Sequence, residues 1–196
     1  MRKKSIKKAA EAFEKDVEAM KEYLDAICEI DLSDEEVTWC HDYAIIRLYR
    51  VFEGFILSSL VASINNDTKQ LAASTGVEFP KHLTDEVCEY IIVKDGYFEF
   101  RGRDGLIKTA KRYLPETHFI VTHIKKATYK DALERLSGLR NFAAHESPTS
   151  KRAALKAIGA KRLSASGAWL KKQERFKKLA DKLCVLTKDI ATSAPY

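Results

Sequence analysis

Hydrophobic residues in the first thirty positions recur at alternating spacings of four and three, the pattern of a helix with one apolar stripe. They are Ile6, Ala10, Phe13, Val17, Met20, Leu24 and Ile27. The pattern predicts a helix over residues 3–30, packed in an antiparallel bundle or against a partner chain. The run covers only about three heptads, which is marginal for a free coiled coil, so packing within a bundle is favoured.

The next predicted helix begins after Ser33 and runs over residues 34–64. Ser33 and Glu36 have the spacing of a capping box, in which each side chain bonds to the other residue's backbone N–H. The helix carries two apolar stripes, Val37, Ala44, Leu48, Val51, Phe55 and Ala62, and Ile45, Tyr49, Phe52, Ile56 and Leu60. Because a helix that is apolar on two sides is normally buried, we expect it at the centre of the fold.

Residues 66–127 have a less regular pattern and are expected to elaborate the bundle. Thr84 is placed to cap a helix over residues 85–94, and Asp95-Gly96 indicates a turn. Residues 97–100 fit either a short strand or an extended segment. Asp104 is placed to cap a further helix that ends near Leu114, before Pro115.

Two further core helices are predicted, over residues 128–145 and 166–191, with a short helix over 150–158 between them. The apolar stripe of the first comprises Ala132, Leu136, Leu139 and Ala143. The inward positions of the last comprise Trp169, Phe176, Leu179, Leu183, Leu186 and Ile190. Together the patterns predict one all-α domain over residues 1–196.

Charge is unevenly distributed along the chain. The net charge is +6, but residues 151–196 hold 12 Lys and Arg against 3 Asp and Glu, which leaves the rest of the chain acidic. Such a basic block favours a polyanionic partner such as nucleic acid. The alternative is a solvated, lysine-rich helix face.

Cysteine usage and the apolar segments bear on the cellular compartment. Cys28, Cys40, Cys88 and Cys184 form no CxxC pair and lie in apolar or amphipathic stretches, as buried free thiols do, so we expect a reducing cytoplasm and no metal site. The start, Met1-Arg2-Lys3-Lys4, lacks the apolar core of a signal peptide. The most apolar window, residues 43–64, contains three charged residues and is expected to be a buried helix, not a membrane span.

The segment Arg140-Asn141-Phe142-Ala143-Ala144-His145 carries the candidate chemistry. It resembles the signature of the HEPN family, in which a polar residue usually follows an arginine and four to six residues in all separate the arginine from a histidine. The resemblance is in particular to the RiboL-PSP and defence-associated ribonucleases. Arg112 and His118 have a similar spacing, but Pro115 lies between them and breaks any common helix. The resemblance implies an all-α HEPN-like bundle with an elaborated middle segment, and a composite active site across a homodimer.

Helix geometry predicts, independently of the resemblance, which way the side chains of the motif point. At about 100° per residue, Asn141 and His145 share a face nearly opposite the predicted core stripe, and Arg140 lies at the edge of that stripe. We therefore expect His145 to be exposed rather than packed in the core. The alternative interpretation is a surface Arg and His near a helix C-terminus, where a protonated His is favoured by the helix dipole.

Arginine and histidine are suited to metal-independent RNA cleavage. A neutral imidazole can remove the proton of the 2′-OH, which then attacks the adjacent phosphorus and leaves a 2′,3′-cyclic phosphate and a 5′-OH. A guanidinium can hold two phosphate oxygens as charge builds on them. Arg140 and His145 are accordingly the predicted catalytic residues, with no metal and no other cofactor.

Supporting roles are predicted for further residues. Asn141 could orient His145 or bind a phosphate, or be a simple surface amide. By resemblance Glu53 could orient Arg140; the alternative is an intrahelical pair with Arg50. Cations of the basic block are expected to follow the RNA backbone, first of all Lys151, Arg152, Lys161 and Arg162, and with them Lys156, Lys171 and Lys172. Trp169 and Phe176 are expected in the core.

The sequence thus predicts a homodimeric endoribonuclease that acts on RNA in toxin–antitoxin or phage-defence systems. We expect it in the cytoplasm, without membrane association, and with an antitoxin or defence protein as a further partner. Some HEPN toxins carry a Tyr two residues after the His, which a nucleotidyltransferase antitoxin modifies; here Ser147 stands there, and that regulation is not expected. The rival hypotheses are a non-catalytic HEPN-like module that binds RNA, nucleotide or protein, and a helical adaptor that recruits a partner through its N-terminal heptads.

Overall fold

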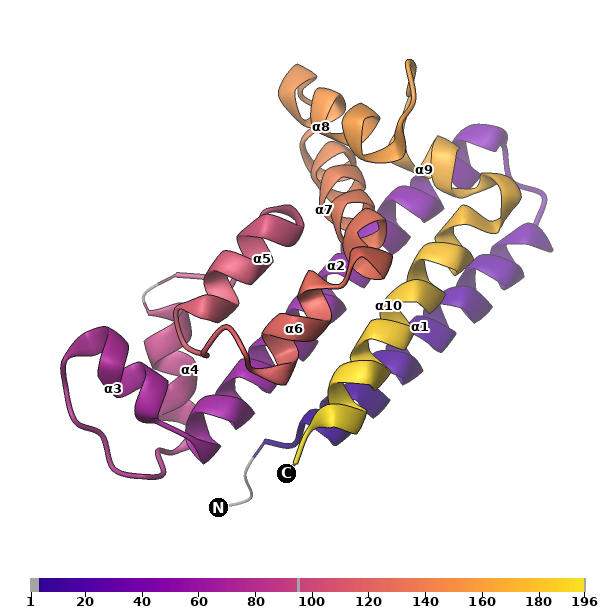
Figure 1. The fold of residues 1–196 in the computed structure, drawn as a ribbon. Coiled ribbons are helices and arrows are strands. Elements are labelled where there is room, and N and C mark those ends of the chain that lie inside the picture. The colour runs from indigo at the N-terminus through magenta and orange to yellow at the C-terminus, as the bar shows by residue number, and fades with distance from the viewer. Residues whose placement is uncertain (1–3, 95, 196) are drawn as a thin grey trace.

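The computed structural model describes residues 4–94 and 96–195, and within them it contains helices and connecting segments but no strand (Figure 1). The all-α prediction is therefore confirmed for the described residues. The helices are α1 (Ile6–Cys28), α2 (Asp34–Asn66), α3 (Lys69–Thr75), α4 (Asp85–Val93), α5 (Gly102–Lys111), α6 (Phe119–Lys125), η1 (Ala127–Tyr129), α7 (Lys130–His145), α8 (Pro148–Ile158), α9 (Ser166–Leu170), η2 (Lys172–Glu174) and α10 (Arg175–Ser193).

The helices surround the long helix α2. Helices α1 and α10 lie side by side and antiparallel, so the two ends of the chain come close together (Figure 1). Helices α4 and α7 pack on further sides of α2, and α3 lies near the C-terminal end of α2. Helix α5 packs on α7, and α6 packs on α5 and α10. Helix α8 packs on α7 at the opposite end, and α9 packs on the N-terminal half of α2.

The two N-terminal helices follow the predicted pattern closely. Helix α1 begins after Ser5, whose hydroxyl accepts a hydrogen bond from the Lys8 N–H. The predicted start at Lys3 lies outside the described residues, as do Met1 and Arg2. Ser33 and Glu36 form the predicted capping box of α2. Nearly all positions of both α2 stripes are buried, which confirms α2 as the central helix.

In the part of the chain that the structure describes, no helix has an apolar run long enough to cross a membrane.

The middle of the chain differs from the prediction at α5. Thr84 caps α4 as predicted, and residues 97–100 are extended without being a strand. Asp95 of the predicted turn lies outside the described residues. Helix α5 begins at Gly102, not at Asp104, and ends at Lys111. The cap comes from α7 instead: Glu134 Oε1 accepts from the Arg103 N–H at 2.9 Å, and Ser137 Oγ accepts from the Gly102 N–H at 3.0 Å.

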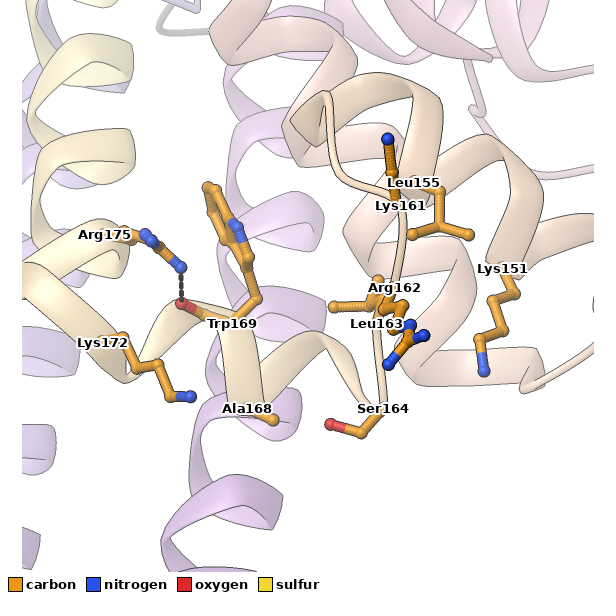
Figure 2. Close-up of a pocket in the computed structure, with 10 residues that line it drawn as sticks. All are labelled: Lys151, Leu155, Lys161, Arg162, Leu163, Ser164, Ala168, Trp169, Lys172 and Arg175. Carbon is orange, nitrogen blue, oxygen red and sulfur yellow. Dashed lines mark hydrogen bonds between the residues drawn. The ribbon is translucent and has the colours of Figure 1, made fainter.

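The predicted single helix over residues 166–191 is wrong. It divides into α9, the turn η2 and α10, because Gln173 and Glu174 adopt left-handed backbone angles, each with φ 55°. As a result Trp169 does not enter the core with Phe176. Its ring lies beside Arg175, which donates a hydrogen bond to the Trp169 carbonyl oxygen (Figure 2).

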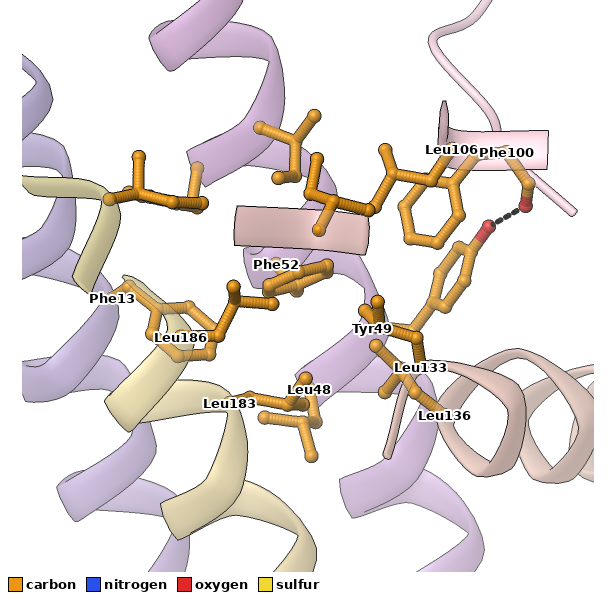
Figure 3. Close-up of a cluster of buried hydrophobic side chains, with 14 of the residues drawn as sticks. Phe13, Leu48, Tyr49, Phe52, Phe100, Leu106, Leu133, Leu136, Leu183 and Leu186 are labelled. Atoms are coloured by element: carbon orange, nitrogen blue, oxygen red, sulfur yellow. Dashed lines mark hydrogen bonds between the residues drawn. The ribbon is translucent and has the colours of Figure 1, made fainter. Parts of the chain in front are cut away.

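One hydrophobic cluster joins the helices (Figure 3). Phe52 of α2 lies at its centre and meets Phe13 of α1 edge to face, with ring centroids 5.8 Å apart. Leu183 and Leu186 of α10 and Leu133 and Leu136 of α7 complete the cluster from the other sides (Figure 3). This continuous core fixes the positions of α2 and α7, the two helices that carry the candidate site.

The cysteines only partly match the expectation of buried thiols. Cys88 is buried, Cys40 and Cys184 are half-buried, and Cys28, the last residue of α1, is exposed. All four are free thiols. The prediction was wrong for Cys28 because a residue in the last turn of a helix extends beyond the neighbouring helices that cover the apolar stripe.

Candidate functional site

His145 ends α7 and is exposed, in the direction that helix geometry predicts. Glu146 then adopts a left-handed conformation, and its N–H donates to the Phe142 carbonyl oxygen, which closes the helix. Within the described residues the imidazole of His145 has no hydrogen-bond or ion-pair partner. It is therefore free to meet a substrate or a second subunit.

Arg140 lies one and a half turns earlier and is held on three sides. Its guanidinium carbon lies 4.5 Å from the centroid of the Tyr49 ring on α2. Its Nη1 donates to Asn141 Oδ1 at 2.8 Å and lies 3.8 Å from Glu99 Oε1. With 22% of its side chain exposed, Arg140 is fixed in direction but retains N–H groups for an anionic ligand.

Tyr49 is the residue that anchors this arrangement. Its hydroxyl donates to the Phe100 carbonyl oxygen at 2.6 Å, and its ring stacks on the Phe100 ring with centroids 5.1 Å apart (Figure 3). Burial raises the pKa of the Tyr49 hydroxyl, which keeps it a hydrogen-bond donor at neutral pH. The extended segment at residues 97–100 is thereby tied to α2, and it brings Glu99 next to Arg140.

Glu53 lies one turn after Tyr49 on the same side of α2. Burial raises the pKa of its carboxyl to about 7, while the nearby Tyr49 hydroxyl and the charge of Arg140 oppose the rise. Its Oε1 is buried and has no hydrogen-bond partner among the described residues. Arg140 acts on this carboxyl more strongly than Arg50, which is exposed and forms no ion pair with a described carboxylate. Glu53 therefore belongs electrostatically to the Arg140 cluster.

The catalytic candidates do not face each other within one protomer. Five residues correspond to about 140° around the axis of α7, so Arg140 points toward α2 while His145 points to another side. Asn141 lies between them: it is bonded to Arg140 and about 40° from His145 around the axis. The structure thus bonds Arg140 to Asn141, with no bond from either residue to His145 in the described ranges.

The predicted RNA-binding residues lie on α8 and on the segment between α8 and α9. Lys151, Lys161 and Arg162 line one cavity of about 580 Å³ between α8 and α9, and Arg152 does not. Arg152 is exposed, 3.5 Å from the Thr149 hydroxyl. A smaller adjoining cavity shares Lys151 and Ser164 with it and is lined by Phe142 and Ala143, not by Arg140 or Asn141.

Two residues of the basic cavity were missed by the sequence reasoning, Trp169 and Arg175, whereas Lys172 had been counted in the basic block. Trp169 had been assigned to the core because its spacing from Phe176 suits a helix. No local signal marks the break after Trp169, because residues 171–174 are all compatible with a helix.

No group of three or more His, Cys, Asp or Glu side chains that could hold a metal ion occurs among the described residues. Comparison of the chain with protein-family models, with curated proteins and with solved structures found no match.

Proposed function

We propose that this chain is a HEPN-like endoribonuclease that cleaves RNA without a metal ion, with Arg140 and His145 as its catalytic residues. The observation that carries the proposal is the fixed position of Arg140 over the Tyr49 ring and its bond to Asn141, which shares a face of α7 with the exposed His145. An arginine held in this way can bind phosphate without losing further side-chain freedom, and this favours stabilisation of the transition state.

The reaction uses the nucleophile that RNA carries. His145 accepts the proton of a 2′-OH, the oxygen attacks the adjacent phosphorus, and Arg140 binds the phosphoryl oxygens as their charge grows. The bond to the 5′-oxygen breaks, and a proton reaches the leaving oxygen from a second acid. Glu53, Tyr49 and Glu99 act by holding Arg140, and they do not touch the RNA.

A second copy of the chain is part of the proposal because one protomer leaves Arg140 and His145 about 140° apart around α7. Two copies related by a two-fold axis would bring the imidazole of each near the guanidinium of the other and would supply both an acid and a base. The cytoplasmic location, the antitoxin or defence partner and the role in toxin–antitoxin or phage-defence systems stay predictions from the resemblance.

Cleavage assays with defined termini test the proposal. The protein is incubated with a 5′-labelled single-stranded RNA in EDTA, and the products should carry a 2′,3′-cyclic phosphate and a 5′-OH. The same RNA with a 2′-deoxynucleotide before the cleaved bond should stay intact at that bond. Cleavage of the deoxy-substituted bond, or products with a 3′-OH, would contradict the mechanism.

The same separation of Arg140 and His145 favours a second candidate function, an RNA-binding module without chemistry. In that case the purified protein would bind RNA in a salt-dependent manner and leave it uncut in EDTA. Size measurements would then show whether a monomer alone binds, since the module does not need a second copy.

A further inference from the structure

Five cationic side chains line the cavity between α8 and α9, and no carboxylate lines it (Figure 2). They are Lys151, Lys161, Arg162, Lys172 and Arg175. None of them forms an ion pair with a carboxylate in the described ranges. The neighbouring Lys171 differs, because its ammonium lies 2.6 Å from Asp34. Like charges that no protein group neutralises make a cavity attractive to an anion.

The same cavity has an aromatic wall. The Arg175 guanidinium carbon lies 4.6 Å from the centroid of the Trp169 ring, and Arg175 Nη1 donates to the Trp169 carbonyl oxygen at 3.3 Å. Arg175 Nη2 also donates to Gln173 Oε1 at 2.9 Å, which fixes the guanidinium beside the ring. Aromatic rings and guanidinium planes are the surfaces on which proteins stack unpaired nucleobases.

The backbone beside the cavity is strained. Gln173 and Glu174 both have φ 55°, a conformation that residues with a Cβ adopt at a cost of about 1–3 kcal/mol. The Gly167 N–H donates to Asp42 Oδ1 at 2.7 Å and fixes α9 against α2. The bend joins α9, which carries Trp169, to α10, which begins at Arg175.

We propose that this cavity binds a nucleotide, with phosphate groups held by Lys161, Arg162 and Lys172 and the base against Trp169 and Arg175. Its volume of about 580 Å³ suits one such ligand. The nucleotide comes either from a free nucleoside triphosphate or from a unit of single-stranded RNA. Because neither Arg140 nor His145 lines the cavity, binding there can be measured separately from cleavage.

Tryptophan fluorescence distinguishes the two sources. The chain has two tryptophans, so Trp39→Phe leaves Trp169 as the reporter, and His145→Ala in the same protein keeps RNA intact. This protein is titrated in EDTA with ATP, with tripolyphosphate and with a five-nucleotide RNA. Quenching by ATP identifies free nucleotide as a ligand, and quenching by the RNA alone identifies the RNA strand. Tripolyphosphate alone should leave the fluorescence unchanged, and as a competitor it should displace the better nucleotide ligand only at higher concentrations than that ligand itself needs.

Paired variants test whether the cations of the cavity carry the binding. Lys161→Ala/Arg162→Ala should lower affinity at least about tenfold, since each charge-assisted hydrogen bond contributes about 1.5–3 kcal/mol. For the RNA, the salt dependence of log K should become shallower by about 1.4, or about 0.7 for each lost phosphate contact. Lys7→Ala/Lys8→Ala, which removes two exposed charges from α1, should bind within about twofold of the parent.

The proposal is overturned if neither ATP nor the RNA binds, or if the Lys161/Arg162 variant binds as tightly as the Lys7/Lys8 variant. It is also overturned if tripolyphosphate binds as tightly as the nucleotides and Trp169 fluorescence does not respond to any of them. All these readouts use a protein without the His145 imidazole, so failure of the ribonuclease proposal leaves them unaffected.

Discussion

Replacing Glu53 by glutamine should raise the free energy of unfolding relative to the wild type, and this gain should grow as the pH rises. Burial holds the pKa of this carboxyl at about 7, against an ordinary value of 4.5. Between these two values the folded protein binds a proton that the unfolded chain has already lost. The wild type therefore loses stability as the pH rises from about 4.5 to about 7, and the full penalty is present above the pKa of the folded state. Glutamine keeps the shape and has no proton to lose.

The magnitude follows from the same values. A pKa difference of this size corresponds to about 3 kcal/mol at 1.36 kcal/mol per pH unit. Solvent reaches the half-buried Glu53 and screens the effect, so we expect about 1–2 kcal/mol. The free energy of unfolding of Glu53→Gln, minus that of the wild type, should thus increase by this amount between pH 5 and pH 8.

Urea denaturation at pH 5, 6, 7 and 8 measures this difference. Glu11→Gln, at an exposed position of α1 outside any described ion pair, is the matched control and should show no trend with pH. A difference for Glu53→Gln that stays constant over this range would refute the argument, because it would mean that Glu53 ionises alike in the folded and unfolded chain.

Two further substitutions test the packing of α9 and the way Arg140 is held. A Cβ at Gly167 would lie 2.0 Å from the Thr38 carbonyl oxygen, so Gly167→Ala should lower the free energy of unfolding by about 3 kcal/mol or more in urea. Gly54→Ala is the matched control, since a Cβ there meets nothing within 4 Å, and it should stabilise α2 by about 0.5–1 kcal/mol; equal effects of the two would contradict the packing. Arg140→Lys keeps the charge but loses the planar contact with Tyr49 and the forked donors, so RNA cleavage should fall about 100-fold while stability changes by less than about 1 kcal/mol. Full cleavage by that variant would show that the guanidinium shape is not used.

The sequence predicted those elements whose signals are local. The capping box at Ser33 and the heptad stripe of α1 depend on neighbours within one helix, and both were predicted correctly. The start of α5 was not, because its first N–H groups bond to Ser137 and Glu134, more than thirty residues away. The break before α10 likewise arises from tertiary contact, since residues 171–174 are all compatible with a helix.

The candidate site likewise has features that local signals predict and features that depend on residues distant in the sequence. The exposure of His145 follows from its phase on α7 and was predictable. The stacking of Arg140 on Tyr49, and the place of Glu99 beside it, require residues 97–100 to lie across α2, which no local pattern indicates. The basic cavity was anticipated as a charge block, but its aromatic wall was missed because Trp169 has the spacing of a core residue.

The most direct test of the account is the rate of RNA cleavage in EDTA by His145→Ala, compared with the wild type and with Thr149→Ala at an exposed position of α8. The account predicts a loss of about 10²–10⁴-fold for His145→Ala, with unchanged circular dichroism and urea midpoint, and no loss for the α8 control. Cleavage by His145→Ala within about twofold of the wild-type rate would contradict it.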